Sequence, residues 1–239
     1  MMSTEERKTI YLCLAHMSEE GFEQKYVKEA FDTNWVVPMG PNVNAFEQNL
    51  ADFANANLDG SKLDRKVVCL SAGTAAVHLA LIACGVKAGD EVCVQSFTFC
   101  ASSHPITYLG AKPVFIDSER ETWNMDPELL EKAIVERKAV TGKYPKAIIP
   151  VALYGMPYDC ERIMAIADKY GIPVIEDAAE GMGSRFNGQV LGTFGRFGVL
   201  SFNGNKMITT SGGGALICRN EEDANNIMWH ATQARDAYP

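Results

Sequence analysis

From Lys66 onward, short apolar runs alternate with stretches that have the apolar spacing of helices. We interpret the runs as buried strands, because short apolar runs bounded by turn residues are typical of strands in a covered sheet. They lie at 67–70, 91–95, 113–116, 147–151, 172–176, 199–202 and 214–218. Strands connected through helices form right-handed crossovers. The sequence therefore predicts the α/β fold class, with a mainly parallel central sheet flanked by helices.

Several helix ends can be placed from their capping residues. A helix over Thr74–Cys84 ends at Gly85, and one over Asp159–Tyr170 ends at Gly171. A third opens at Asp126-Pro127, with aspartate at the cap and proline in the first turn.

The chain before Lys66 predicts two further helices. The first spans Glu19–Asp32 and has one apolar face, formed by Phe22, Tyr26, Val27, Ala30 and Phe31. The second is capped by Asn42 and carries the apolar residues Val43, Phe46, Leu50 and Phe53.

Composition excludes several classes of function. The chain of 239 residues has 22 basic against 30 acidic residues, which argues against a protein that binds nucleic acid through the phosphate backbone. No apolar run approaches the length of a membrane span, and the run Ile10–Ala15 is too short for a signal peptide. The 7 cysteines include no C-x-x-C pair, so we expect buried free thiols in a reducing cytosol and neither a disulfide framework nor a zinc site.

Two clusters with possible chemistry follow the first two predicted strands. Residues 71–76 turn from strand to helix, and their small side chains would let backbone N–H groups approach an anion at the helix N-terminus. Alone, this cluster is more typical of a tight turn with a threonine cap. Residues 96–99 include Phe97 and Phe99, which could cover a planar ligand; the alternative is core packing.

Two more clusters follow later strands. Asp177 comes directly after a buried run and needs a cation or hydrogen-bond donors to stay ionised, although it could equally cap a following helix. Lys206 lies among small, polar and apolar residues ahead of the glycine run 212–214. Partial desolvation would favour its neutral, nucleophilic form, whereas the ordinary alternative is a solvated surface lysine.

Together the four clusters supply the parts of a pyridoxal 5'-phosphate site. This cofactor needs an anion cradle, an aromatic face, a carboxylate for its ring nitrogen and a lysine for its Schiff base. The carboxyl ends of parallel strands meet at one edge of a sheet, where ligands bind. No G-x-G-x-x-G follows the first strand and no P-loop occurs, which disfavours dinucleotides and nucleoside triphosphates.

The chain resembles the DegT/DnrJ/EryC1/StrS family of pyridoxal phosphate-dependent sugar-nucleotide aminotransferases, which have the type I aminotransferase fold. The motifs that carry the resemblance lie at 73–76, 96–99, 110–117, 176–180, 191–195 and 201–206. The stretch 203–214 is most similar to the branch that makes UDP-N-acetylbacillosamine precursors. That branch implies transfer of an amino group from L-glutamate to a 4-keto-6-deoxy UDP-N-acetyl sugar by a ping-pong mechanism.

The resemblance implies a role for each matching residue. The catalytic residues are Lys206, as the Schiff-base lysine and proton shuttle, and Asp177, as the partner of the ring nitrogen. The residues implied to bind the cofactor include these two and six others. The others are Phe99, which stacks on the ring, Gly73 and Thr74 at the phosphate turn, Ser201 and Asn203 as further phosphate or nearby ligands, and Glu180 beside the ring hydroxyl.

Two of these positions depart from the pattern of many relatives. Those relatives have His at position 203 and His or Gln at position 180, whereas this chain has Asn203 and Glu180. The residues found here are similar to those of the bacillosamine branch.

The resemblance also implies an organisation for the whole chain. We expect residues 1–60 to form a helical segment that contributes to the active-site region, and residues 61–239 to form the large, cofactor-binding domain. Thr232–Pro239 resembles a stretch that the family carries in mid-chain, so we expect a truncated chain without the small C-terminal domain. The family further implies a homodimer, and the expected free thiols indicate a cytoplasmic protein.

Two other interpretations stay open at this point. The substrate could be another keto nucleotide sugar, with the keto group at C3 or C4. The chain could also be a cofactor-binding fragment without activity. A related dehydratase branch has histidine in place of the lysine, so Lys206 argues against it.

Overall fold

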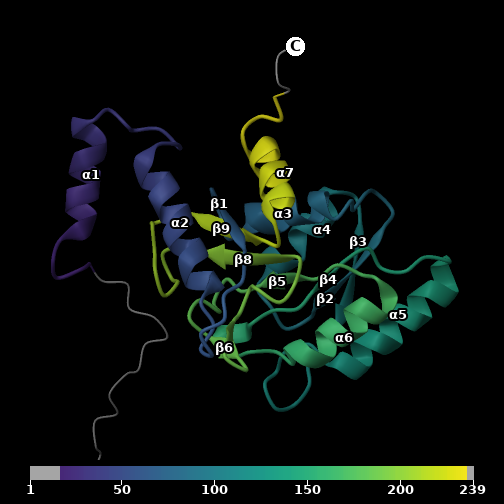
Figure 1. Cartoon of the computed structure of the whole chain (residues 1–239). Helices are drawn as coiled ribbons and strands as arrows, with labels where there is room; N and C mark the ends of the chain where they lie inside the picture. Colours follow the sequence, from purple (N-terminus) through teal and green to yellow (C-terminus); the bar gives the residue numbers. More distant parts are fainter. Residues whose placement is uncertain (1–16, 236–239) are drawn as a thin grey trace, which may run out of the picture.

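A computed structural model describes residues 17–235 as helices that pack on both faces of a mixed β-sheet (Figure 1). The predicted apolar run 10–15, Cys13 and residues 236–239 lie outside the described residues. The helices of the described chain are α1 (Phe22–Asp32), α2 (Pro41–Asn55), α3 (Gly73–Ala83), α4 (His104–Tyr108), α5 (Pro127–Thr141), α6 (Cys160–Tyr170) and α7 (Glu221–Ala231). Two short 3-10 turns are η1 (Cys100–Ser102) and η2 (Leu153–Gly155).

The strands confirm the predicted α/β fold class. They are β1 (Lys66–Leu70), β2 (Glu91–Gln95), β3 (Lys112–Ile116), β4 (Ile148–Ile149), β5 (Ile175–Asp177), β6 (Arg185–Phe186), β7 (Gln189–Val190), β8 (Phe197–Ser201) and β9 (Gly214–Cys218). Two hydrogen-bonded groups, β3-β2-β4 and β5-β8-β9-β1, are joined by parallel bridges at Ile148–Val174 and Val151–Asp177. The strands β6 and β7 form a separate hairpin.

The sheet is mainly parallel, as the sequence predicts. Strand β2 pairs in parallel with β3 and β4, and β5 pairs in parallel with β8. Strand β9 runs antiparallel to both β1 and β8, because the connection from β8 to β9 is a loop and not a crossover helix.

Neighbouring residues of each strand contribute to different cores, as the period of two requires. Cys93, Ile148 and Ile217 pack with residues of α2, α5 and α6. Val94, Ile149 and Leu216 pack with residues of α3, α4 and α7. Figure 1 shows α5 and α6 on one side of the sheet and α3, α4 and α7 on the other.

The capping residues fix most of the helix ends as predicted. The Asp126 carboxylate accepts the backbone N–H groups of Glu128 and Leu129, and that of Asp159 accepts the N–H of Arg162. Asn42, however, is not a cap: α2 begins at Pro41 after Gly40. Proline suits the first helical position because its fixed φ is already helical and it has no N–H group to satisfy.

Two of the predicted strands are shorter in the structure. The run 147–151 gives only Ile148–Ile149, and the run 172–176 gives Ile175–Asp177. Pro150 and Pro173 lie next to these strands and cannot donate to a ladder, although their carbonyl oxygens accept from Asp177 and Ile148.

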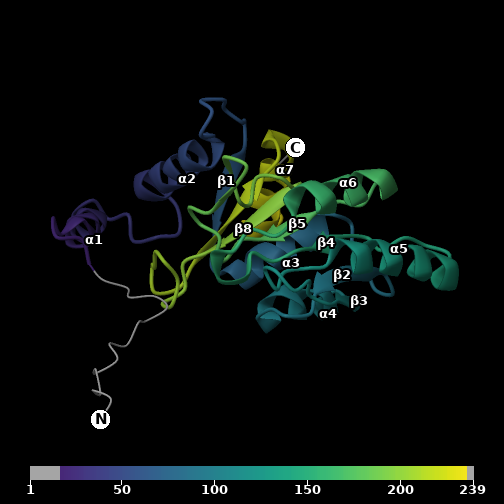
Figure 2. The ribbon, with the colours of Figure 1, turned by 90° about the horizontal axis from the view of Figure 1, so that it is seen from below.

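The helix predicted near the N-terminus forms, but its apolar face is not buried. Helix α1 begins at Phe22, three residues later than predicted, and none of its residues is buried. In Figures 1 and 2 it stands apart from the helices that cover the sheet. Phe31 is 72% exposed. The periodicity therefore predicts the helix correctly, while the described residues provide nothing that covers its face.

The described cysteines are free thiols, as predicted, although not all of them are buried. Cys84, Cys93, Cys160 and Cys218 are buried, whereas Cys100 is exposed. Burial raises the pKa of the Cys93 thiol to about 12, so this group stays protonated at neutral pH. Within residues 17–235, none of the helices combines the length and the apolar character that a membrane span requires.

The end of β5 is fixed by a buried carboxylate. Glu176 accepts the backbone N–H groups of Gly192, at 2.9 Å, and Gly195, at 2.7 Å. Burial raises the pKa of Glu176, and the hydrogen bonds from Gly195 and Gly192 oppose this rise. The turn around Gly192 is thereby held against β8, so closely that a Cβ atom on Gly198 would lie 2.0 Å from the Gly192 carbonyl oxygen.

This contact predicts that Gly198→Ala destabilises the fold by about 3 kcal/mol or more, because the clash is with backbone and must shift a strand. Gly204→Ala is the matched control, since the nearest atom to its Cβ would be the Ser211 oxygen at 3.9 Å. Urea unfolding followed by circular dichroism measures both. Equal midpoints for the two variants would contradict the packing described here.

Candidate active site

A cavity of about 610 Å³ opens at the C-terminal ends of β5 and β8 and at the N-terminus of α3. All of the predicted site residues line it, and they come from separate parts of the chain. They are Gly73, Thr74, Phe99, Asp177, Glu180, Ser201, Asn203 and Lys206. The structure therefore brings together every residue that the sequence assigns to the site.

The first wall is the N-terminus of α3. The helix follows Ala72 in extended conformation, and no side chain caps its first N–H groups. The alternative of a threonine cap at Thr74 is therefore wrong. A Cβ atom on Gly73 would come within 3.2 Å of the Ser201 Cβ, so the absence of a side chain lets β8 approach. Uncapped N–H groups at a helix start favour an anion.

Glycine is also required where β9 begins. A Cβ atom on Gly214 would lie 2.4 Å from the Ala72 carbonyl carbon and 2.5 Å from the Gly73 nitrogen. The start of β9 thus packs directly on the backbone that leads into α3. This contact joins the end of the loop that carries Lys206 to the anion-binding turn.

Asp177 ends β5 and is buried, with 6% of its surface exposed. Its Oδ2 accepts the Ser102 hydroxyl at 2.5 Å, and its Oδ1 accepts the Ala179 N–H at 3.2 Å. Burial raises the pKa of Asp177, while these two hydrogen bonds and the charge of Lys206 act against the rise. Residues 178–181 form a turn and not a helix, so the helix-cap alternative is wrong.

Lys206 is not a solvated surface lysine. Only 16% of its side chain is exposed, and its Nζ lies 3.1 Å from the Glu180 Oε1. The other carboxylate oxygen of Glu180 accepts the backbone N–H of Tyr154 at 2.9 Å. Tyr154 has φ of 51°, in the left-handed region that is uncommon for a residue with a side chain. Glu180 is therefore held from one side and pairs with Lys206 on the other.

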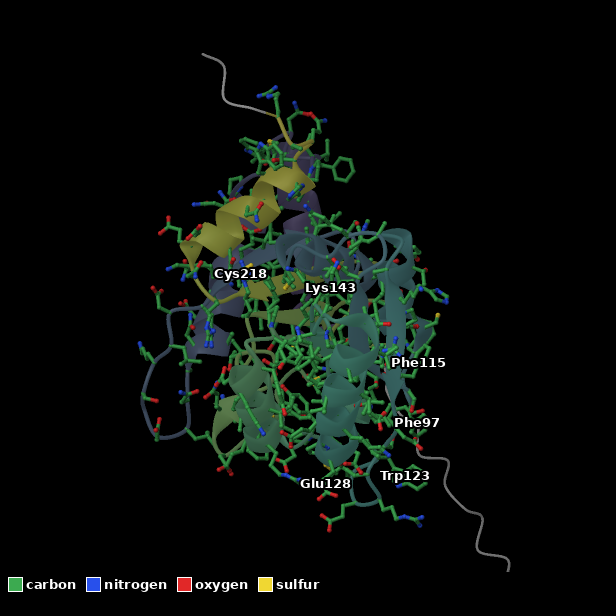
Figure 3. The ribbon with its side chains drawn as sticks, turned by 90° about the vertical axis from the view of Figure 1, so that its right-hand side faces the viewer. Phe97, Phe115, Trp123, Glu128, Lys143 and Cys218 are labelled. Atoms are coloured by element: carbon green, nitrogen blue, oxygen red, sulfur yellow. The ribbon has the colours of Figure 1, made fainter. Side chains whose placement is uncertain are left out.

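The two phenylalanines after β2 are exposed at the cavity and not packed in the core. Phe99 is 77% exposed and Phe97 is 48% exposed, so the core-packing alternative is wrong for both. Phe97 packs edge-on against Trp123 with ring centroids 6.2 Å apart, and Figure 3 shows the two side by side. An aromatic face is thus available at the cavity wall.

Two residues of the site, Ser102 and Tyr154, have no signal in the sequence, and Thr98 lies in the motif 96–99 without a role assigned to it. Ser102 donates to Asp177 and pairs with Thr98, and Tyr154 reaches Glu180 through its backbone N–H. Serine and threonine are common after strands, and a backbone donor leaves no mark on residue type. A spacing rule could not have selected them.

A second cavity of about 590 Å³ lies next to the first and shares Ser71, Gly212 and Gly213 with it. Its other walls include Tyr26 of α1 and Asn42, Phe46 and Asn49 of α2. The described part of the N-terminal segment lines this second cavity. That residues 1–60 contribute to the active-site region stays a prediction.

Comparison with known proteins gives the family context. EpsN of Bacillus subtilis, whose name describes a pyridoxal phosphate-dependent aminotransferase, is 50% identical over 229 residues, which are 96% of this chain and 56% of EpsN. A GDP-perosamine synthase from Escherichia coli O157:H7 is 39% identical over 87% of this chain and 53% of its own length. The chain spans about half the length of these relatives.

A solved structure agrees with the fold. Spr1654 of Streptococcus pneumoniae, named as a sugar aminotransferase and solved in a PMP-form, has a TM-score of 0.79 with 29% identity, over 92% of this chain and 56% of that chain. The model of one family matches residues 17–236. The chain therefore belongs to the DegT/DnrJ/EryC1/StrS aminotransferase family.

Proposed function

We propose that the protein binds pyridoxal 5'-phosphate in the 610 Å³ cavity and uses it to transfer an amino group from L-glutamate to a keto sugar of a sugar nucleotide. The sugar that we favour is a 4-keto-6-deoxy UDP-N-acetyl sugar. We further propose that it does so as a cytoplasmic homodimer. One observation carries the proposal: a part-buried lysine, a buried carboxylate and an uncapped helix start line the same cavity.

The residues of the cavity fit this cofactor. The uncapped N–H groups of α3 and the Ser201 hydroxyl would hold the phosphate. Asp177 accepts its hydrogen bonds from two neutral donors, the Ser102 hydroxyl and the Ala179 N–H, and the charge of Lys206 also acts on it. A protonated ring nitrogen would place a further positive charge beside this buried carboxylate, and Phe99 would cover the ring.

The protein's own groups can be assigned to the steps of proton transfer. Lys206 would hold the cofactor and then carry the proton from the donor carbon. Glu180, anchored by the Tyr154 N–H, lies close enough to orient the Lys206 Nζ. Asp177 would keep the ring nitrogen protonated. When bound, the cofactor supplies the electron-accepting ring that this chemistry requires.

The choice of a UDP-linked sugar rests on the similarity of the stretch 203–214 to the bacillosamine branch. A second candidate is a GDP-linked keto sugar, since one relative is named a GDP-perosamine synthase. Both candidates use the same cofactor site, so only the substrate can separate them.

We expect Lys206→Ala to abolish covalent attachment of pyridoxal phosphate and to lower the rate of transamination about 1,000-fold or more, because Lys206 is the one lysine among the described residues that line the cavity. Borohydride reduction followed by peptide mapping locates the attachment. Lys169→Ala is the control, since Lys169 pairs with Glu131 on the surface. Attachment at another lysine in the unaltered protein would refute the assignment, and attachment without turnover would favour the inactive fragment.

We expect Asp177→Asn to slow the half-reaction with L-glutamate about 100-fold, with a smaller effect on cofactor affinity, because an amide cannot keep the ring nitrogen protonated. Stopped-flow absorbance and equilibrium titration measure the two quantities. An unchanged rate would remove Asp177 from this role.

The same variant carries a prediction about pH and stability without cofactor. The pKa of Asp177 in the folded protein lies above its ordinary value of 3.8. Between these two pKa values the folded protein binds the proton more tightly than the unfolded chain does, so the free energy of unfolding falls as the pH rises through this range. The amide that replaces the carboxyl could still pair with both neighbours, because the Ser102 hydroxyl can also accept. Asp177→Asn should therefore be the more stable protein at pH 7, with a difference that shrinks towards pH 4, as urea unfolding across this pH range would measure. A difference independent of pH would contradict this.

A substrate panel tests the sugar. We expect the 4-keto-6-deoxy UDP-N-acetyl sugar to give a kcat/KM at least about 10-fold above those of GDP-linked 4-keto and UDP-linked 3-keto sugars, since a site built for one set of polar groups leaves them unpaired with another. The reverse order would favour the GDP-linked substrate.

A further inference from the structure

Two hydroxyl groups form a chain beneath the carboxylate of Asp177. The Ser102 Oγ lies 2.5 Å from the Asp177 Oδ2, and the Thr98 Oγ1 lies 2.7 Å from the Ser102 Oγ. Ser102 is fully buried, whereas Thr98 lines the cavity. The chain of hydrogen bonds therefore runs from the cavity wall to the back of the carboxylate.

The proton positions in this chain depend on the charge of Asp177. An ionised carboxylate only accepts, so the single hydroxyl proton of Ser102 must point to Asp177. The Ser102 oxygen is then free to accept, and Thr98 must donate to it. If Asp177 is protonated, the whole chain can reverse. The arrangement with Thr98 as the first donor is thus the one that stabilises the negative charge.

The position of Ser102 is set by the same short segment that carries the aromatic wall. Phe99 precedes η1, and Ser102 ends it, with its backbone N–H donating to the Phe99 carbonyl. One turn thus separates the exposed ring at the cavity from the buried hydroxyl below Asp177. The other charged groups that act on Asp177 are Lys206 and Glu180, which have opposite effects on its ionisation.

We propose that Ser102, oriented by Thr98, is a positioning residue that holds the Asp177 carboxylate ionised and fixed in orientation for the ring nitrogen of the cofactor. The inference rests on the proposed function and adds to it two residues outside the set assigned above to the cofactor. If the inference holds, Ser102 contributes to the binding affinity only of a ligand that has the ring nitrogen.

The experiment compares two probes on the cofactor-free protein: pyridoxal 5'-phosphate, and its analogue in which a C–H group replaces the ring nitrogen. We expect Ser102→Ala to weaken binding of pyridoxal phosphate about 10-fold or more, because a hydrogen bond to a charged group is lost. Binding of the analogue should change less than about 2-fold. Ser102→Thr, which keeps the hydroxyl, should restore the preference for the natural cofactor.

Ser103→Ala is the matched control, because the neighbouring serine donates only to the Cys100 carbonyl. It should leave both affinities unchanged. Equal losses for both probes in Ser102→Ala would show a merely structural role and overturn the inference. An unaltered protein that binds neither probe, or that is not labelled on Lys206, would instead refute the proposed function together with the inference.

Thr98→Val covers the case in which Ser102→Ala does not fold. Valine keeps the shape of threonine but cannot donate to Ser102. We expect a loss of about 3-fold for pyridoxal phosphate and none for the analogue, since the Ser102 hydroxyl would remain but without its orienting partner. Unchanged affinity for both probes would overturn the relay from Thr98.

Discussion

Two consecutive carboxylates are buried at the end of β5, and the site depends on how each is satisfied. Successive residues of a strand point to opposite faces, so Glu176 and Asp177 need separate sets of donors. Glu176 takes two backbone N–H groups from the turn at Gly192 and Gly195. Asp177 takes the Ser102 hydroxyl and the Ala179 N–H. A buried charge without such donors would cost several kcal/mol.

Satisfying Glu176 on one face builds part of the site on the other. The turn that donates to Glu176 is pulled onto β8, where Gly198 leaves room for its backbone. Strand β8 then runs beside β5 and delivers Ser201 to the cavity. The loop that follows β8 is closed by the hydrogen bond from the Phe202 N–H to the Gly213 carbonyl, and it carries Lys206 to Glu180.

How much could be predicted from the sequence depends on whether the signal is local. Lys206, Asp177 and Phe99 lie in short motifs after apolar runs, and the parallel sheet makes such strand ends meet. Ser102 and the Tyr154 N–H act through proximity in space, which no spacing records. The shortened strands follow from Pro150 and Pro173, which a simple count of apolar residues overlooks. The exposed face of α1 shows that the spacing of apolar residues predicts a helix with an apolar face but does not show which part of the molecule packs on that face.

Gly73 packs on a side chain and Gly214 packs on backbone, and this difference determines which other residues each position could accept. A side chain at 73 would come closest to the Cβ atom of Ser201, so glycine at 201, which has no Cβ, could relieve the contact. A side chain at 214 would meet the backbone of Ala72 and Gly73, which every substitution leaves in place. A second substitution could therefore compensate for a side chain introduced at 73, whereas none could compensate for one introduced at 214. In a randomised library, glycine at 214 would persist whatever its neighbours become.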